Sequence, residues 1–193
     1  LAALVTSETA KGIVQMATSA EVITGTLTSK GVSPKTLQEK VNAIDLTPPT
    51  EELIVSYQTA TGVNGGNTTQ NAWTLYPLNT VDSNSITGAT TNIGSSEFTL
   101  PIGTYQVNGI CSVGNDIGQL RIYNTTDASV SFNGKVIGYD RERSLIGQFT
   151  IAVAKTFRVE YYITNDTVGV GLGTAINNGN AEVFGSIAIT KTG

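Results

Sequence analysis

The amino-acid sequence predicts a mainly β protein, an antiparallel sandwich of the jelly-roll kind preceded by a short helical or irregular segment. Three observations support this fold class. Apolar and polar residues alternate along several stretches after residue 100, as they do in half-buried antiparallel strands. Turn clusters rich in Gly, Asn and Asp separate these stretches. The composition also changes near residues 46–51, from short helical patterns to Gly, Asn, Thr and alternating apolar residues.

Residues 1–46 are predicted to form a neck with two short helices. The first is expected over 17–25 and the second over 33–41, where Ser33 and Pro34 are favourable first residues. Helices of two or three turns are marginal in water, and so short a segment cannot bury a core of its own. We therefore expect the neck to pack on another copy of itself.

The two prolines Pro48 and Pro49 stop any helix, so residues 47–51 are predicted to be a linker. The head domain is then expected over 52–193. The alternating patterns predict its strands at 103–111, 120–123, 130–132, 148–153, 157–163 and 183–189.

The composition excludes several classes of function. The chain has 193 residues, a net charge of -4 and no His, so the commonest general base and metal ligand is absent. Its single Cys cannot form an internal disulfide or a thiolate zinc site. With 11 basic against 15 acidic residues it is a poor candidate for binding nucleic acid. No apolar run approaches the ~20 residues of a membrane-spanning helix, so no membrane insertion is expected.

No pattern points clearly to catalysis. Asp140 and Glu142, flanked by Arg141 and Arg143, contain a carboxylate pair of the type that glycosidases use. The simpler interpretation is a solvent-exposed turn in which these acidic and basic side chains neutralise one another. We therefore predict that the chain is not an enzyme. The Gly-rich stretches 62–66 and 169–173 precede no helical pattern, so flexible loops are favoured over phosphate-binding loops.

Ligand sites in the loops are weakly supported. Oxygen atoms of Asn115–Asp116 and Asn165–Asp166 are candidate Ca²⁺ ligands, but no regular Asp-x-Asp spacing supports them, so no cofactor or metal is predicted. Trp73 has the chemistry to stack on a sugar ring, although packing within the fold is the favoured interpretation. Cys111 lies on the apolar face of a strand and is expected to be a buried small hydrophobe.

Several segments resemble proteins of bacteriophage tail fibres. The stretch 11–37 is similar to a recurring fibre segment, although Met16 replaces a usual Leu and Leu27 a usual Asp. The stretches 65–80, 98–105 and 120–127 are similar to the C-terminal heads of phage receptor-binding proteins, whose jelly roll is of the complement and tumour-necrosis-factor type.

The resemblance implies the C-terminal part of a tail-fibre protein, located in the virion and joined to other tail proteins. It further implies a homotrimer with the head on a threefold axis and the neck below it. The implied function is adhesion to a host cell-surface receptor, a glycan or an outer-membrane protein, without catalysis.

Two aromatic residues are candidates for the trimer interface. Tyr162 and Phe184 are predicted on the faces opposite the main apolar rows of their strands. Aromatic residues are enriched at subunit interfaces, but scattered surface aromatics are an equally open interpretation.

The receptor-contacting end follows from strand alternation. If the neck and the last strand both end at the base, successive antiparallel connections alternate between tip and base. The predicted receptor-binding residues at the tip are then Asn115, Asp116, Tyr139, Asp140, Arg141, Glu142, Arg143, Asn165, Asp166, Asn177, Asn178 and Asn180.

Two other functions stay open on the sequence alone. A structural fibre or collar module would have a similar composition but would not bind cells. A polysaccharide depolymerase is disfavoured by the missing His, the short length and the absence of a β-helix repeat.

Overall fold

A computed structural model describes residues 50–114, 116–138 and 142–193, so both helices predicted in the neck lie outside the described residues. Residues Thr50–Gly193 form one compact unit. Its strands are β1 (Glu51–Thr59), β2 (Thr74–Leu75), β3 (Thr80–Asn84), β4 (Thr90–Asn92), β5 (Glu97–Leu100), β6 (Gly103–Ser112), β7 (Gly118–Asn124), β8 (Ser129–Asn133), β9 (Glu142–Ile151), β10 (Lys155–Ile163) and β11 (Glu182–Lys191). The 3₁₀ turn η2 (Ile93–Ser95) is the only helical element among the described residues.

The strands form two antiparallel sheets, and the predicted mainly β sandwich is confirmed. One sheet has the order β3-β1-β11-β6-β9, and the other has β4-β5-β10-β7-β8, with β2 added beside β10. From β8 onward each strand crosses to the other sheet, and the first strand β1 pairs with the last strand β11. This is the connectivity of a jelly roll.

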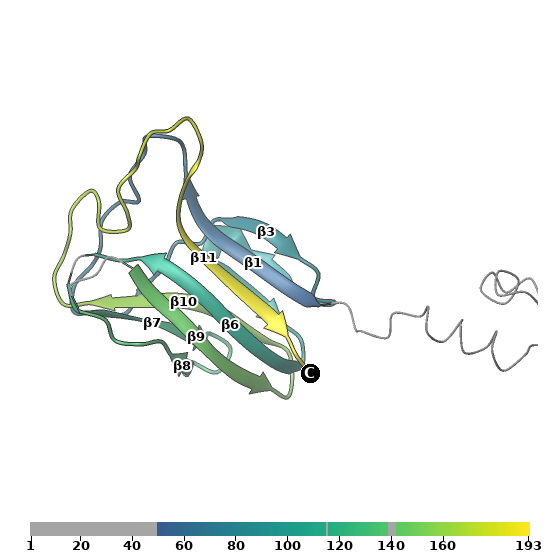
Figure 1. Cartoon of the computed structure of the whole chain (residues 1–193). Helices are drawn as coiled ribbons and strands as arrows, with labels where there is room; N and C mark the ends of the chain where they lie inside the picture. The colour runs from purple at the N-terminus through teal and green to yellow at the C-terminus, as the bar shows by residue number, and fades with distance from the viewer. Residues whose placement is uncertain (1–49, 115, 139–141) are drawn as a thin grey trace, which may run out of the picture. The chain divides into compact units, whose positions relative to one another are not determined.

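The sandwich has two distinct ends, which Figure 1 shows. At the base, Glu51 of β1 pairs with Lys191 of β11, so the chain enters and leaves the head at the same end. At the opposite end, the tip, Thr59 pairs with Glu182, and Ser112 of β6 pairs with Glu142 of β9. The predicted linker ended at Glu51, but this residue is already the first of β1.

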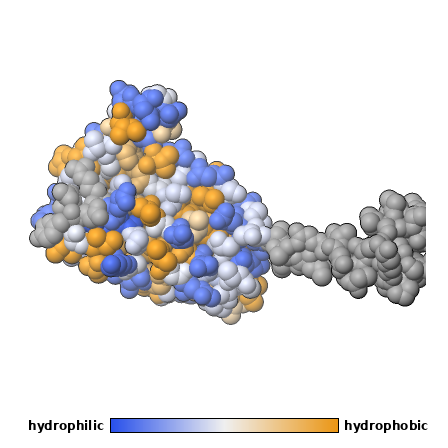
Figure 2. Space-filling view, viewed as in Figure 1, coloured by the Kyte–Doolittle hydropathy of each residue, from blue (hydrophilic) through white to orange (hydrophobic). Residues whose placement is uncertain are grey.

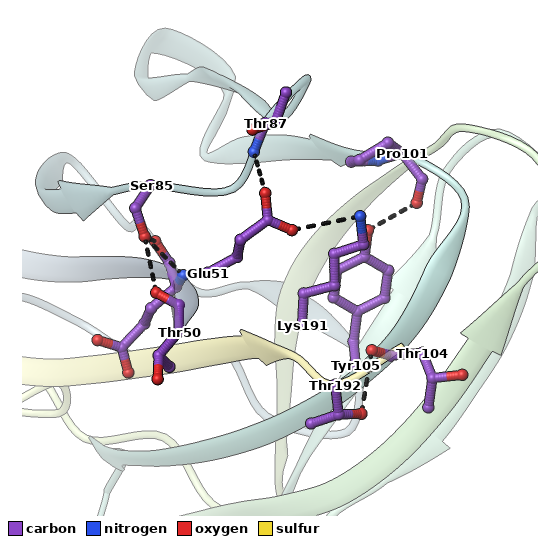
Figure 3. A network of polar contacts seen from close by, with 10 residues as sticks. Thr50, Glu51, Ser85, Thr87, Pro101, Thr104, Tyr105, Lys191 and Thr192 are labelled. Carbon is purple, nitrogen blue, oxygen red and sulfur yellow. Dashed lines mark hydrogen bonds and ion pairs between the residues drawn. The ribbon is translucent and has the colours of Figure 1, made fainter. Parts of the chain in front are cut away.

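Polar contacts hold the base together (Figure 3). The Glu51 carboxylate accepts the backbone N–H of Thr87 at 3.0 Å and pairs with the Lys191 ammonium at 3.3 Å. The Tyr105 hydroxyl donates to the carbonyl oxygen of Pro101 at 2.7 Å. These contacts join the first and last strands to each other and to the turn at Thr87, and they join β6 to the turn that precedes it.

The core lies between the inward faces of the two sheets. Phe157 of β10 lies 5.1 Å from Phe149 of β9 and 6.0 Å from Phe98 of β5, measured between ring centroids. Phe149 also lies 5.7 Å from Tyr105 of β6. Full burial of one such side chain stabilises the fold by about 1.5–3 kcal/mol. This aromatic cluster therefore packs β6 and β9 of one sheet against β5 and β10 of the other.

Candidate functional site

The tip is built from four connections between strands. They are the segments 60–73, 113–117, 134–141 and 164–181, of which residues 115 and 139–141 are outside the described part. Strand register brings them together, because Thr59 pairs with Glu182 in one sheet and Gly118 pairs with Ile163 in the other. The tip therefore lies at the end of the head opposite to Thr50 and Gly193 (Figure 1).

Most of the predicted receptor-binding residues that the structure describes lie in or next to these connections. They are Asp116, Glu142, Asn165, Asp166, Asn177, Asn178 and Asn180, and all except the half-buried Asp116 are exposed. Asn115, Tyr139, Asp140 and Arg141 lie outside the described residues. The role of all these residues in binding stays a prediction.

The structure corrects the placement of Arg143. Strand β9 begins at Glu142, and its alternation turns Arg143 inward, where its side chain is fully buried. Its guanidinium donates a hydrogen bond to the backbone carbonyl oxygen of Asp116. Arg143 thus fixes the 113–117 connection from inside and is not exposed to a receptor.

The two Gly-rich stretches pair with each other, contrary to the expectation of flexible loops. The N–H of Gly65 donates to the carbonyl oxygen of Gly173 at 2.9 Å, and the N–H of Leu172 donates to Gly66 at 3.2 Å. A Cβ at Gly65 would lie 2.4 Å from the carbonyl oxygen of Leu172. Only glycine permits this close approach of the two backbones.

A buried carboxylate that sequence reasoning missed links the same two connections. The carboxylate of Glu182, the first residue of β11, accepts backbone N–H groups from Gly62 at 3.1 Å, Ile176 at 3.2 Å and Asn177 at 2.8 Å. These hydrogen bonds, that from Gly62 foremost, lower the pKa of Glu182 below its ordinary value. The sequence offers no signal for this role, because the donors are main-chain groups.

Phe184 is not on an outer face, which corrects its predicted place at a trimer interface. Tyr57 pairs with Gly185 and Gln58 with Val183, so Phe184 is the extra residue of a β-bulge. The bulge reverses the alternation and buries the ring inside its own chain, 5.9 Å from the ring of Tyr57.

Tyr162 lies on the outer face of the other sheet. Its half-buried ring packs 5.6 Å from the ring of Trp73, whose face is covered by the Arg121 guanidinium at 4.0 Å. Trp73 therefore packs within the fold, which was the favoured interpretation. Because Tyr162 and Phe184 belong to different sheets, they do not form one shared surface.

A hollow of about 450 Å³ opens at the tip beside the start of β11. Its lining includes two predicted residues, Glu142 and Asn178, and residues that strand alternation did not suggest. These are chiefly Ser112, Thr174, Ile176 and Val183. We call this feature the tip hollow.

The two predicted Ca²⁺ segments contact each other through Asp116. One oxygen of its carboxylate accepts the N–H of Ile117 at 2.7 Å, and the other accepts the side-chain amide of Asn165. Within the described ranges, no group of three or more His, Cys, Asp or Glu side chains is placed to hold a metal ion.

Among the described residues, no helix is both long and apolar enough to cross a membrane.

Comparisons with known proteins find similar solved structures, among them two of murine APRIL. No family model and no curated protein sequence matches the chain. The chain is similar to the crystal structure of murine APRIL at pH 8.5, with a TM-score of 0.46 and 11% sequence identity, over 74% of this chain and 99% of that one. The structure of murine APRIL at pH 8.0 is similar over the same shares, with a TM-score of 0.45 and 9% identity.

Proposed function

We propose that the chain is the receptor-binding tip of a bacteriophage tail fibre and attaches the virion to a host cell as a homotrimer, without catalysis. The partners would be a host surface glycan or outer-membrane protein at the tip and other tail proteins at the base. The resemblance of residues 11–37 and of the head segments to fibre proteins supports this function.

The observation that carries the proposal is the separation of the two ends. Thr50 and Gly193 both lie at the base, where Glu51 of the first strand pairs with Lys191 of the last strand. The four connections meet at the far end, and two of them, 60–73 and 164–181, carry exposed amides and carboxylates there. A receptor that binds there does not compete with whatever the head is attached to.

The face of the sheet that contains β6, β9 and β11 supports self-association. The outward side chains of β6 are all uncharged. Those of β11 are uncharged before Lys191, and those of β9 are uncharged after Glu142. Ile110 is 52% exposed and Ile146 is 66% exposed on this face. Figure 2, which views the head from this side, shows hydrophobic patches among weakly polar ones. Apolar side chains in an uncharged surface are typical of subunit contacts. We therefore assign the trimer contact to this face in place of Tyr162 and Phe184.

The first test is the solution mass by light scattering, for which a homotrimer requires three times 20.2 kDa. The second is binding of the fluorescently labelled trimer to intact bacteria from a panel of strains. Tyr139→Ala combined with Arg141→Ala should weaken binding to a recognised strain and leave the trimer intact. The exposed base variant Ile102→Ala is the control and should bind like the parent.

Three results would contradict the proposal. A monomer at the concentrations that bind cells would remove the trimeric fibre head. A trimer that binds no strain would indicate a structural spacer. Release of reducing sugar from host polysaccharide would indicate a depolymerase.

A further inference from the structure

The chain contains four Asn-Gly dipeptides, and the structure holds one of them differently from the other three. They are residues 64–65, 108–109, 133–134 and 178–179. In such a dipeptide the backbone nitrogen of Gly can attack the side-chain amide carbon of Asn, because Gly has no Cβ to obstruct the approach. Whether this happens in a folded protein depends on how firmly the backbone of the Gly is held.

Three of the dipeptides are held by backbone pairing. Gly65 donates its N–H to the carbonyl oxygen of Gly173 at 2.9 Å, and Gly134 donates to that of Leu120 at 2.8 Å. Gly109 lies within β6, which is paired with β11 on one side and with β9 on the other. All three of these glycines are buried. Their nitrogens are therefore released only when part of the head opens.

The fourth dipeptide, Asn178-Gly179, lies in an exposed segment. Residues 177–181 are all exposed at the tip, where the chain leads into β11 (Figure 1). The Gly179 N–H donates to a side-chain hydroxyl, that of the exposed Thr61 at 3.2 Å, which water can replace. A Cβ on Gly179 would meet no described atom within 4 Å, so the backbone has room to move. Gly179 can therefore rearrange without opening the sandwich.

The side chain of Asn178 is also activated for this attack. Its oxygen accepts the backbone N–H of Asn180 at 3.0 Å, which forms an Asx turn. The hydrogen-bonded ring contains both the amide carbon of Asn178 and the nitrogen of Gly179, so the turn holds the two atoms toward each other. A donor on the amide oxygen also stabilises the negative charge that develops there when the nitrogen attacks.

We propose that Asn178 is a site of spontaneous deamidation, in which the backbone nitrogen of Gly179 displaces the side-chain amide group. A bond forms between the Gly179 nitrogen and Cγ of Asn178, and the Cγ–Nδ2 bond breaks. The proton of the Gly179 N–H leaves with the amide nitrogen as ammonia. Water then opens the cyclic imide at either carbonyl and gives aspartate or isoaspartate. Nothing is oxidised or reduced, and the chemistry holds whether or not the chain is an adhesin.

The modification changes the surface of the tip hollow. Asn178 lines this hollow together with Glu182, whose carboxylate already carries hydrogen bonds from the backbone N–H groups of Ile176 and Asn177. Deamidation adds a negative charge to the same lining. Isoaspartate also inserts an extra main-chain carbon before Gly179, which alters the path of the segment that Glu182 holds.

The test follows the full chain by peptide mapping with mass spectrometry during storage in mildly alkaline buffer, which favours deprotonation of the attacking nitrogen. Exchange of the amide for a carboxyl group raises the mass of the peptide, and chromatography separates the isoaspartate form. In the native protein we expect Asn178 to react about tenfold or more faster than Asn64, Asn108 and Asn133, because those three require local opening. In denaturant the difference should disappear, since no dipeptide is then held by pairing.

Gly179→Ala tests the attack itself. A methyl group on the attacking residue should slow the reaction at Asn178 about tenfold or more, although the variant strains the backbone. Gly169→Ala is the matched control, because Gly169 also has a positive φ, +78° against +91° for Gly179, and no described atom within 4 Å of a Cβ. It should react at Asn178 like the parent.

Three results would overturn the site. One is a native Asn178 that reacts no faster than the three paired dipeptides. Another is an unchanged rate at Asn178 in Gly179→Ala. The third is a product that contains aspartate without isoaspartate, since direct hydrolysis of the amide by water gives aspartate alone.

Discussion

The carboxylate of Glu182 accepts a hydrogen bond at 3.1 Å from the backbone N–H of Gly62, at a sequence separation of 120 residues. This contact closes the connection after β1 onto the start of β11, the strand beside it. Two further N–H groups of the segment before β11 bind the same carboxylate. The buried side chain of Glu182 thus holds two of the four connections at the tip, 60–73 and 164–181, by hydrogen bonds to their backbones.

Replacing Glu182 should loosen the tip without unfolding the head. In Glu182→Gln the side chain keeps its shape but loses its charge, so the bonds to Gly62, Ile176 and Asn177 become weaker. Hydrogen exchange measured by mass spectrometry should rise in 60–73 and 174–181 and stay unchanged in β6 and β10. Glu52→Gln at the base is the control, and equal protection of the tip in both variants would contradict the assigned role.

Acid should have the same effect on the parent protein. Because hydrogen bonds lower the pKa of Glu182 in the folded state, its stabilising effect is complete above the ordinary carboxyl pKa of about 4.3. It is lost as the pH falls through the lowered pKa. The difference in tip exchange between the parent and Glu182→Gln should therefore be present at about pH 7 and disappear at about pH 2. A difference that persists at the lower pH would exclude the ionised carboxylate as its cause.

Gly173 should tolerate no side chain. Its φ of +128° is strained for other residues, and a Cβ would lie 2.0 Å from the Phe184 ring. Gly173→Ala should lower the free energy of unfolding by about 3–5 kcal/mol, from backbone strain and overpacking together. Gly179 has a φ of +91° and no atom within 4 Å of such a Cβ, so Gly179→Ala should lower it by only about 1–2 kcal/mol. Urea unfolding at one protein concentration gives both values, and equal losses would rule out the contact with Phe184.

The alternation of apolar residues predicted the longer strands because half-buried strands carry that signal within a few residues. The structure confirms the strands expected within β6, β7, β8, β10 and β11, whereas the strand expected over 148–153 overlaps β9 but runs past its end at Ile151. Strands β1, β3, β4 and β5 were not predicted. Strands β3 and β4 are polar edge strands whose pairing is decided by neighbours far away in the sequence, and β1 begins inside the predicted linker. At the tip, alternation located the connections, but the bulge at Phe184 and the inward turn of Arg143 depend on where pairing begins.

Cys111 should not react with thiol reagents in the native protein. Its side chain is fully buried in β6, and this burial raises the pKa of the thiol far above its ordinary value. At about pH 8 a thiol with the ordinary pKa near 8.5 is partly ionised, whereas this one stays protonated and inaccessible. Mass spectrometry after iodoacetamide treatment should show no adduct in buffer and complete modification in denaturant. Rapid labelling in buffer would show that the two sheets separate at the tip end of β6.

Glu160 should contribute more to stability than Arg158, the more exposed of the two arginines that it binds. Its carboxylate is 2% exposed and pairs with Arg121 and with Arg158 at 2.5 Å each. Glu160→Ala leaves two guanidinium groups on the outer face of β10 and β7 without this partner, and Arg121 is largely buried. The free energy of unfolding should fall by about 3–5 kcal/mol.

The matched variant Arg158→Ala removes the more exposed member of the same cluster. Arg158 is 36% exposed, and Glu160 keeps its bonds to Arg121 in this variant, so the loss should be about 0.2–1 kcal/mol. Both values come from urea unfolding at low and high salt. Added salt should shrink the small loss but not the large one, because a buried pair is screened much less than an exposed pair. Equal losses in the two variants would mean that Glu160 acts through packing and not through its charge.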